Sequence, residues 1–196
     1  MLGCHDGIPL LDLKGLLPDE QIQKLIDTVV ARGGYIKNLH GQKNVYYQIN
    51  ATYYSALGED DRKMLLARAL QLFMPGKPQI WYLDLFAGKN DYEAVKHAGP
   101  GGHKEINRTN LSSGQIEAML KRAVVAQQLQ LLQMRSRYKA FSADAFITVQ
   151  SDTAHMVFAW QAAGQNAILN ADLSTCAFTI EVTGTDGALL FRFVQK

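Results

Sequence analysis

The chain has 196 residues, of which 47% are hydrophobic and 19% are charged, and its formal net charge is +2. This length suffices for one domain and a smaller second one, and the composition is that of an ordinary soluble globular protein. The weak charge without a basic run argues against nucleic acid or a membrane surface as partner, and no stretch reaches the roughly 18 apolar residues of a membrane span. Cys4 and Cys176 are far apart and predict free thiols in a reducing compartment, the cytoplasm.

The first eight residues combine a short apolar run with an adjacent histidine and aspartate, His5 and Asp6, followed at once by Gly7. We interpret them as the end of a buried strand, where Gly7 lets the chain turn away. In parallel α/β architectures this carboxyl edge carries the catalytic groups. A site-bearing strand with nothing before it predicts that the sequence opens in the middle of a larger domain.

Two helices and a second strand are predicted next. Apolar residues recur at helical spacing over 19–30, and residues 59–73 form a strong helix that is apolar on most sides. Residues 79–83 read as a second core strand, so strand, helix pair and strand predict a parallel α/β unit with a right-handed crossover. Between the helices, residues 35–47 are expected to form an exposed loop, and residues 45–57 a packed strand or a short helix.

Residues 84–110 form a Gly-rich polar segment, which the parallel arrangement would place at the same edge as Asp6. A helix follows from Ser112 or Ser113 to about Tyr138. From Phe141 the pattern changes to about five short strands, with a hairpin loop over 183–187. The sequence therefore predicts α/β plus β, with one domain over 1–140 and a small antiparallel β domain over 141–196.

Several polar groups could carry chemistry, and each also has a purely structural interpretation. Asp6 could simply bond backbone amides at a strand end, and Arg108 could be a surface arginine paired with Glu105. The tyrosines near Gln48 could face solvent. The spacing of histidines and cysteines fits no metal site, so no metal is expected. The candidates are His5, Asp6, Tyr47, Gln48, Lys104 and Arg108.

Five ordered motifs over residues 1–110 resemble those of sucrose phosphorylases, in the α-amylase superfamily (glycoside hydrolase family 13). They are His-Asp-Gly-Ile at 5–8 with Leu-Leu-Pro-Asp at 16–19, Tyr-Gln-Ile-Asn-Ala-Thr-Tyr-Tyr-Ser-Ala-Leu at 47–57, Pro-Gly-Lys-Pro-Gln at 75–79, Ala-Gly-Lys-Asn-Asp at 87–91 and Glu-Ile-Asn-Arg at 105–108. The resemblance implies the last two β/α units of a (β/α)8 TIM barrel, followed by a C-terminal β domain.

The reaction that the resemblance implies is the phosphorolysis of an α-glucoside to α-D-glucose 1-phosphate with retention, without a cofactor and with inorganic phosphate as co-substrate. In such a mechanism one carboxylate attacks the anomeric carbon and a second carboxylic acid protonates the leaving group. In the family both groups come from earlier barrel strands. The chain by itself is therefore expected to be inactive.

The resemblance also assigns roles to the candidate residues. Asp6 matches the carboxylate that stabilises the transition state, and His5 and Arg108 match residues that hold the glucosyl unit. Tyr47 and Gln48 match a mobile loop that faces the acceptor or phosphate. The family has an acid two residues before this tyrosine, where the chain has Val45, so fructose as the natural leaving group is in doubt.

Other motifs favour the glucosylglycerate phosphorylases of the same subfamily, whose acceptor is an anion that Lys104 could bind, together with His40 and Lys43. Sucrose is the second choice. The partners expected for the intact enzyme are an α-glucoside, phosphate and a separately encoded N-terminal barrel fragment. The alternatives are an inert truncated remnant, or a β domain that acts as a carbohydrate-binding or oligomerisation module.

Overall fold

The computed structural model describes the backbone of residues 1–38 and 46–196, and the side chains of 1–36 and 48–196. The chain divides into two compact units, Met1–Asp61 with Gln79–Val125 and Arg62–Pro78 with Ala126–Lys196. Over the described residues, the helices are too short or too polar to cross a membrane.

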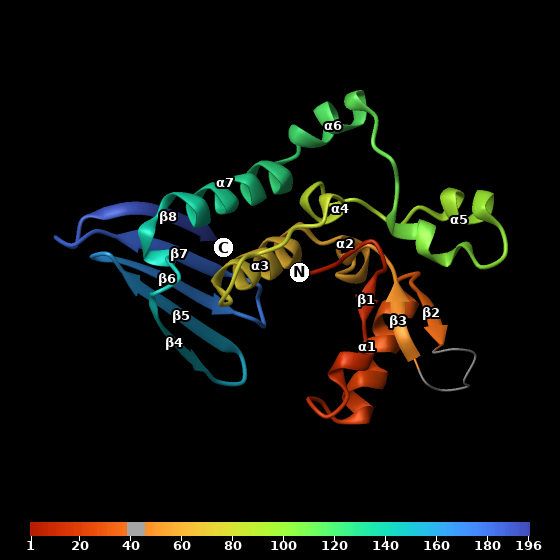
Figure 1. Cartoon of the computed structure of the whole chain (residues 1–196), viewed down its shortest axis with the longest axis horizontal. Helices are drawn as coiled ribbons and strands as arrows, with labels where there is room; N and C mark the ends of the chain where they lie inside the picture. The colour runs from red at the N-terminus through yellow and green to blue at the C-terminus, as the bar shows by residue number, and fades with distance from the viewer. Residues whose placement is uncertain (39–45) are drawn as a thin grey trace. The chain divides into compact units, whose positions relative to one another are not determined.

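The first unit is built around a three-stranded antiparallel sheet of order β1-β3-β2. Its strands are β1 (Ile8–Pro9), β2 (Tyr35–Asn38) and β3 (Tyr46–Asn50). The helix α1 (Asp19–Ala31) lies beside the sheet (Figure 1) and buries Ile22, Ile26 and Val29 in one cluster with Ile49. The amphipathic helix predicted from the apolar spacing is therefore confirmed, since its apolar stripe is the face that packs on β3.

The rest of the first unit consists of short helices and connecting segments. They are η1 (Leu11–Leu13), α2 (Tyr53–Ala56), α4 (Tyr82–Leu85), α5 (Tyr92–Ala98), η3 (Gly102–Asn107) and α6 (Ser113–Leu120). Residues 45–57 were predicted to form a packed strand or a short helix, and this segment contains both, the strand β3 followed by the helix α2. Thr52 caps α2, with its hydroxyl accepting a hydrogen bond from the Ser55 amide.

The two predicted core strands of a parallel sheet are wrong for this structure. Cys4–Gly7 is a turn, closed by a 3.0 Å hydrogen bond from Gly7 N to Cys4 O, and residues 79–81 lead directly into α4. All strand pairs in the described sheets are antiparallel. The physical reason is that side chains take the place of a neighbouring strand: Asp84 accepts from Gly3 N at 2.8 Å, and Asn107 donates to Cys4 O at 2.6 Å.

The exposed loop predicted over 35–47 is also corrected. Its two ends are the paired strands β2 and β3, with Ile36 opposite Ile49. These ends lack the alternation of apolar residues that would have indicated strands. Residues 39–45, which include His40, Lys43 and Val45, lie outside the described part of the chain.

The second unit contains a five-stranded antiparallel meander of order β4-β5-β6-β7-β8 (Figure 1). The strands are β4 (Phe146–Ser151), β5 (His155–Ala162), β6 (Gln165–Asp172), β7 (Phe178–Thr183) and β8 (Leu189–Gln195). The five predicted strands and the hairpin loop between the last two are confirmed. All five follow Phe141, while a domain boundary at that residue stays a prediction.

One face of this sheet supplies the core of the second unit. Buried residues alternate along β5, β6 and β7, and include Phe158, Trp160 and Leu169. Trp160 donates its indole N–H to Phe73 O at the end of α3 (Asp61–Phe73), and η4 (Lys139–Phe141) brings Phe141 against Trp160. The strong helix predicted over 59–73 is confirmed as α3.

The long helix predicted from residue 112 to about 138 is instead two helices, α6 and α7 (Ala123–Arg137). The break falls at Lys121 and Arg122. Arg122 donates to the backbone oxygens of Phe86 and Ala87, both at 3.0 Å. The sequence periodicity could not show this interaction, because its partners lie 36 and 35 residues away.

Candidate functional site

The tight turn Cys4–Gly7 presents His5 and Asp6 next to β3. Gly7 has a φ of +109°, and a Cβ placed on it would lie 2.2 Å from the Ile49 carbonyl oxygen. Only glycine combines this backbone conformation with so close an approach. The glycine after His5-Asp6 is therefore required for the turn to lie against the sheet.

Three buried amide side chains hold the backbone of this turn. From β3, Gln48 and Asn50 both donate to the carbonyl oxygen of Asp6, at 2.6 and 2.7 Å. From the end of η3, Asn107 donates to the carbonyl oxygen of Cys4. Each of the three is at most 3% exposed. The backbone carrying Asp6 is thus fixed from two elements that are far apart in sequence.

The Asp6 carboxylate lies in a cluster of three potential cations. Lys104 donates to Oδ1, Arg108 Nη2 lies 3.4 Å from the same oxygen, and His5 Nε2 lies 3.3 Å from Oδ2. The hydrogen bond from Lys104 holds the pKa of Asp6 below its ordinary value, against the effect of desolvation. Asp6 is therefore ionised at neutral pH, and its side chain remains 35% exposed and open to a ligand.

Arg108 links the carboxylate to the turn and to η3. Its Nε donates to the His5 carbonyl oxygen at 2.9 Å, and its Nη1 lies 3.3 Å from Glu105. The pairing with Glu105, which the sequence offered as a purely structural alternative, therefore coexists with the contact to Asp6. One guanidinium can serve both because it carries five N–H donors in a fixed geometry.

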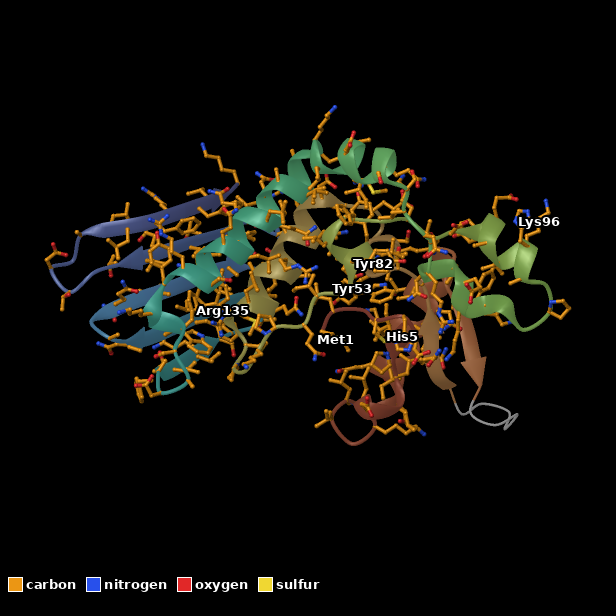
Figure 2. The ribbon with its side chains drawn as sticks, turned by 45° about the horizontal axis from the view of Figure 1, so that its top comes forward. Met1, His5, Tyr53, Tyr82, Lys96 and Arg135 are labelled. Carbon is orange, nitrogen blue, oxygen red and sulfur yellow. The ribbon has the colours of Figure 1, made fainter. Side chains whose placement is uncertain are left out.

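Aromatic side chains lie beside His5. Its ring centroid is 6.1 Å from that of Trp81, which in turn is 4.5 Å from that of Tyr82. Figure 2 labels His5, on the N-terminal segment, and Tyr82, which belongs to α4. His5 is 60% exposed, so its imidazole is accessible from solvent.

The structure brings together four of the six residues predicted for the site: His5, Asp6, Lys104 and Arg108. Gln48, which was expected on a mobile loop facing the acceptor or phosphate, lies instead in β3, where it is 3% exposed and donates its amide N–H to the Asp6 carbonyl oxygen. Tyr47 belongs to β3, and its side chain lies outside the described part. Sequence reasoning missed Asn50, Asn107 and Trp81, and the only signal for the two asparagines was their position inside the quoted motifs.

One set of potential metal ligands occurs among the described residues, namely Cys4, His5 and Asp6, whose ligand atoms lie within 4.8 Å of one another. The geometry does not favour a cation there. Asp6 already pairs with Lys104 and Arg108, and the Cys4 sulfur contacts Asp6 N at 3.4 Å and Gly7 O at 3.6 Å. An ionised carboxylate flanked by N–H donors is suited instead to binding hydroxyl groups.

The chain is similar over almost its whole length to sugar phosphorylases. It is 52% identical over 189 residues to a sucrose 6(F)-phosphate phosphorylase of Ilumatobacter coccineus, covering 92% of this chain and 36% of that protein. It is 39% identical to a protein of the same name from Thermoanaerobacterium thermosaccharolyticum, covering 95% and 39%. A glucosylglycerate phosphorylase of Escherichia coli is 32% identical, covering 76% and 29%. A search of protein-family models gave no match.

The fold is shared with a solved structure of the same kind. The crystal structure of sucrose 6F-phosphate phosphorylase from Thermoanaerobacter thermosaccharolyticum matches with a TM-score of 0.90 and 37% identity, covering 100% of this chain and 39% of that one. The chain thus spans well under half the length of the relatives it matches. It belongs to the sucrose phosphorylase-like enzymes and corresponds to the C-terminal part of such an enzyme.

Proposed function

We propose that the intact protein is a retaining α-glucosyl phosphorylase. This chain would contribute His5, Asp6, Lys104 and Arg108, here called the Asp6 cluster, to its glucosyl site. The proposal rests on the proximity of the side chains of His5, Asp6 and Arg108. These residues come from two of the family motifs, about 100 positions apart in sequence. They converge in a chain that is 52% identical to a named phosphorylase.

The chemistry proposed for the cluster follows from its charges. A retaining mechanism uses two carboxyl groups about 5 Å apart, of which one attacks the anomeric carbon and the other protonates the leaving group. The glucosyl unit is then transferred to phosphate. Residues outside this sequence would supply both groups. Asp6 is ionised at neutral pH, and the hydrogen bond from Lys104 holds its pKa below the ordinary value, so its negative charge can stabilise the positive charge that develops on the sugar ring. Arg108 and His5 would hold sugar hydroxyls.

The proposal extends to the fold of the intact protein. There, residues 1–4, which precede the turn, and residues 79–81, which precede α4, would pair with neighbouring segments as the last two strands of a (β/α)8 barrel, and residues 141–196 would be its C-terminal β domain. Support comes from the match of the whole chain to 39% of the solved sucrose 6F-phosphate phosphorylase, with a TM-score of 0.90. The remaining barrel strands would come from the same polypeptide or from a separately encoded N-terminal fragment.

We propose an anionic leaving group, and sucrose 6F-phosphate as the first candidate donor. The two relatives at 52% and 39% identity carry that substrate in their names, while a glucosylglycerate phosphorylase is 32% identical. Both donors release an anion, a phosphate ester in one case and a carboxylate in the other. Lys104 supports either, because its ammonium group has two further N–H donors besides the one given to Asp6.

The experiment uses a chimera in which this chain replaces the matching residues of the Ilumatobacter coccineus relative. Phosphate-dependent release of glucose 1-phosphate is measured with sucrose 6F-phosphate, glucosylglycerate and sucrose. We expect kcat/KM to be highest for an anionic donor. Lys104→Met should lower kcat/KM more for the anionic donors than for sucrose. Equal use of sucrose would contradict the anionic leaving group, and a folded chimera inactive on all three would contradict the proposed function.

A further inference from the structure

Trp81 is an aromatic side chain at the edge of the Asp6 cluster to which nothing above assigns a role. It precedes α4 as its N-cap residue, in extended conformation. Its ring lies 6.1 Å from the His5 ring at an interplanar angle of 53°, and the indole is partly exposed. The polar groups of the cluster thus have an aromatic surface as a direct neighbour.

The indole is held in place by the same residue that holds the turn. Trp81 donates its Nε1–H to the Asn107 carbonyl oxygen at 3.3 Å, while the Asn107 side chain donates to the Cys4 carbonyl oxygen at 2.6 Å. Asn107 is 1% exposed. Tyr82 packs against the indole, and its own hydroxyl donates to Thr109 O at 2.6 Å. Trp81 is therefore fixed relative to the backbone of His5 and Asp6.

A glucose ring presents two kinds of surface, hydroxyl groups around its edge and C–H groups on its faces. Ligand sites generally combine a few placed polar groups with apolar or aromatic walls. Aromatic rings pack well on apolar surfaces and lose little conformational entropy, because they have only two side-chain torsions. The Asp6 cluster offers the polar half of such a site, and a fixed, partly exposed indole offers the apolar half.

We propose that Trp81 forms the aromatic wall of the glucosyl site and packs against a C–H face of the glucose ring. The inference rests on the proposed function for the identity of the sugar. It adds a binding residue that determines affinity for the ring, alongside Asp6, His5 and Arg108, which contact the hydroxyl groups. Asn107, which bonds both the turn and the indole, would then fix the polar and the aromatic parts of the site relative to each other.

The chain allows a direct optical test, because Trp81 and Trp160 are its two tryptophans. Trp160 is 3% exposed and donates its indole N–H to Phe73 O in the second unit. The variant Trp160→Phe therefore leaves Trp81 as the sole tryptophan. We expect its fluorescence to change saturably when D-glucose or methyl α-D-glucopyranoside is added, and not with glycerol at equal concentration. Asp6→Asn should abolish the change.

Sugar affinity is measured in parallel by saturation-transfer NMR, which does not depend on tryptophan. Trp81→Ala should weaken binding about tenfold, and Trp81→Phe by no more than about threefold, since an aromatic contact of this kind is worth on the order of a factor of ten. Circular dichroism and the thermal midpoint verify folding of each variant. Unchanged affinity in folded Trp81→Ala, a response that persists in Asp6→Asn, or no saturable binding by the unmodified chain would overturn the proposal.

The chimera separates this proposal from the proposed function. If the chimera releases glucose 1-phosphate and Trp81→Ala leaves the KM for the glucoside unchanged, the role of Trp81 is wrong while the function stands. If glucose binding depends on Trp81 but the folded chimera is inactive on every donor, the aromatic wall stands and the reaction is wrong. Recovery of KM by Trp81→Phe would identify the aromatic face, rather than the indole N–H, as the contributing group.

Discussion

Lys104 lowers the pKa of the Asp6 carboxylate more than any other group does, because the largest effect on that pKa is the hydrogen bond from its ammonium group. In Lys104→Met we expect the pKa of Asp6 to rise, since desolvation then acts with less opposition. The measurement is a carboxyl-carbon NMR titration. Lys96→Met, which removes an exposed lysine paired with Glu93 at 3.9 Å, is the control and should leave the pKa of Asp6 unchanged.

The sign of the linked stability effect follows from the direction of that shift. A carboxyl whose pKa is lower in the folded state contributes stability above its unfolded pKa and loses it as the pH falls through the folded value. As the pH is lowered from about 5 to the acid limit of folding, the free energy of unfolding should therefore fall less in Lys104→Met than in the unmodified chain. Denaturant unfolding at each pH measures it. A Lys104→Met chain with an unshifted Asp6 titration would contradict this account.

Gly7 is the residue at which a single methyl group should do most harm to the turn. A Cβ at Gly7 would lie 2.2 Å from the Ile49 carbonyl oxygen, whereas Gly15, which also has a positive φ, has nothing within 4 Å. Gly15→Ala should cost about 1 kcal/mol of the free energy of unfolding through backbone strain alone. Gly7→Ala should cost clearly more, because the backbone of β3 must move. Equal losses of the free energy of unfolding in the two variants, measured by chemical denaturation, would contradict the close approach of Gly7 to the Ile49 carbonyl oxygen.

For single residues, sequence reasoning identified the side chains that carry charge, but not those that hold the backbone of the turn. His5, Asp6, Lys104 and Arg108 were recognisable because each brings chemistry and lies in a motif. Asn50 and Asn107 bond the carbonyl oxygens of a turn that is distant from them in sequence. No periodicity marks such a role, and it is visible only once the chain is folded.

Helices and strands differed in how well local pattern predicted them. The helix α1 and the sheet β4–β8 were predictable because an amphipathic stripe and successive alternating strands each repeat over many residues. The predicted strands around residues 1–4 and 79–83 rested on apolar runs of only a few residues, and a run of that length does not distinguish a strand from the start of a helix. In this structure the second of these runs enters α4.

Arg135 of α7 binds three separate segments of the second unit (labelled in Figure 2). It donates to the backbone oxygens of Leu72 at 2.9 Å and of Gly76 and Phe141, both at 3.2 Å. Its guanidinium also lies 4.5 Å from the Phe141 ring centroid. Arg135→Met should lower the free energy of unfolding by about 2 to 4 kcal/mol, because the part-buried carbonyl groups of Leu72 and Phe141 lose their donor.

The control for that prediction is Arg137→Met on the same helix. Arg137 is exposed and lies 5.8 Å from the Tyr138 ring, so its loss should cost no more than about 0.5 to 1 kcal/mol. Both values come from urea unfolding curves followed by circular dichroism. A loss for Arg135→Met that does not exceed that for Arg137→Met would mean that the three backbone contacts contribute little to stability.

For the whole molecule, the site is only part of the machinery that the proposed reaction needs. The chain spans 36% and 39% of two of its named relatives, and the nucleophile and acid proposed above lie outside it. The isolated chain should therefore release no glucose 1-phosphate from any donor, as a phosphate-dependent assay of the purified protein would show. Release at a rate above that of buffer would mean that the described residues contain a complete site.

The central claim is that the Asp6 cluster stabilises the transition state of glucosyl transfer to phosphate. The most direct measurement is the rate of phosphate-dependent glucose 1-phosphate release by the chimera, with Asp6 and with Asp6→Asn. We predict that the substitution lowers kcat at least about 100-fold while the fold is kept, because it removes a charge aimed at the reacting sugar. An Asp6→Asn chimera that keeps most of its kcat would contradict the account.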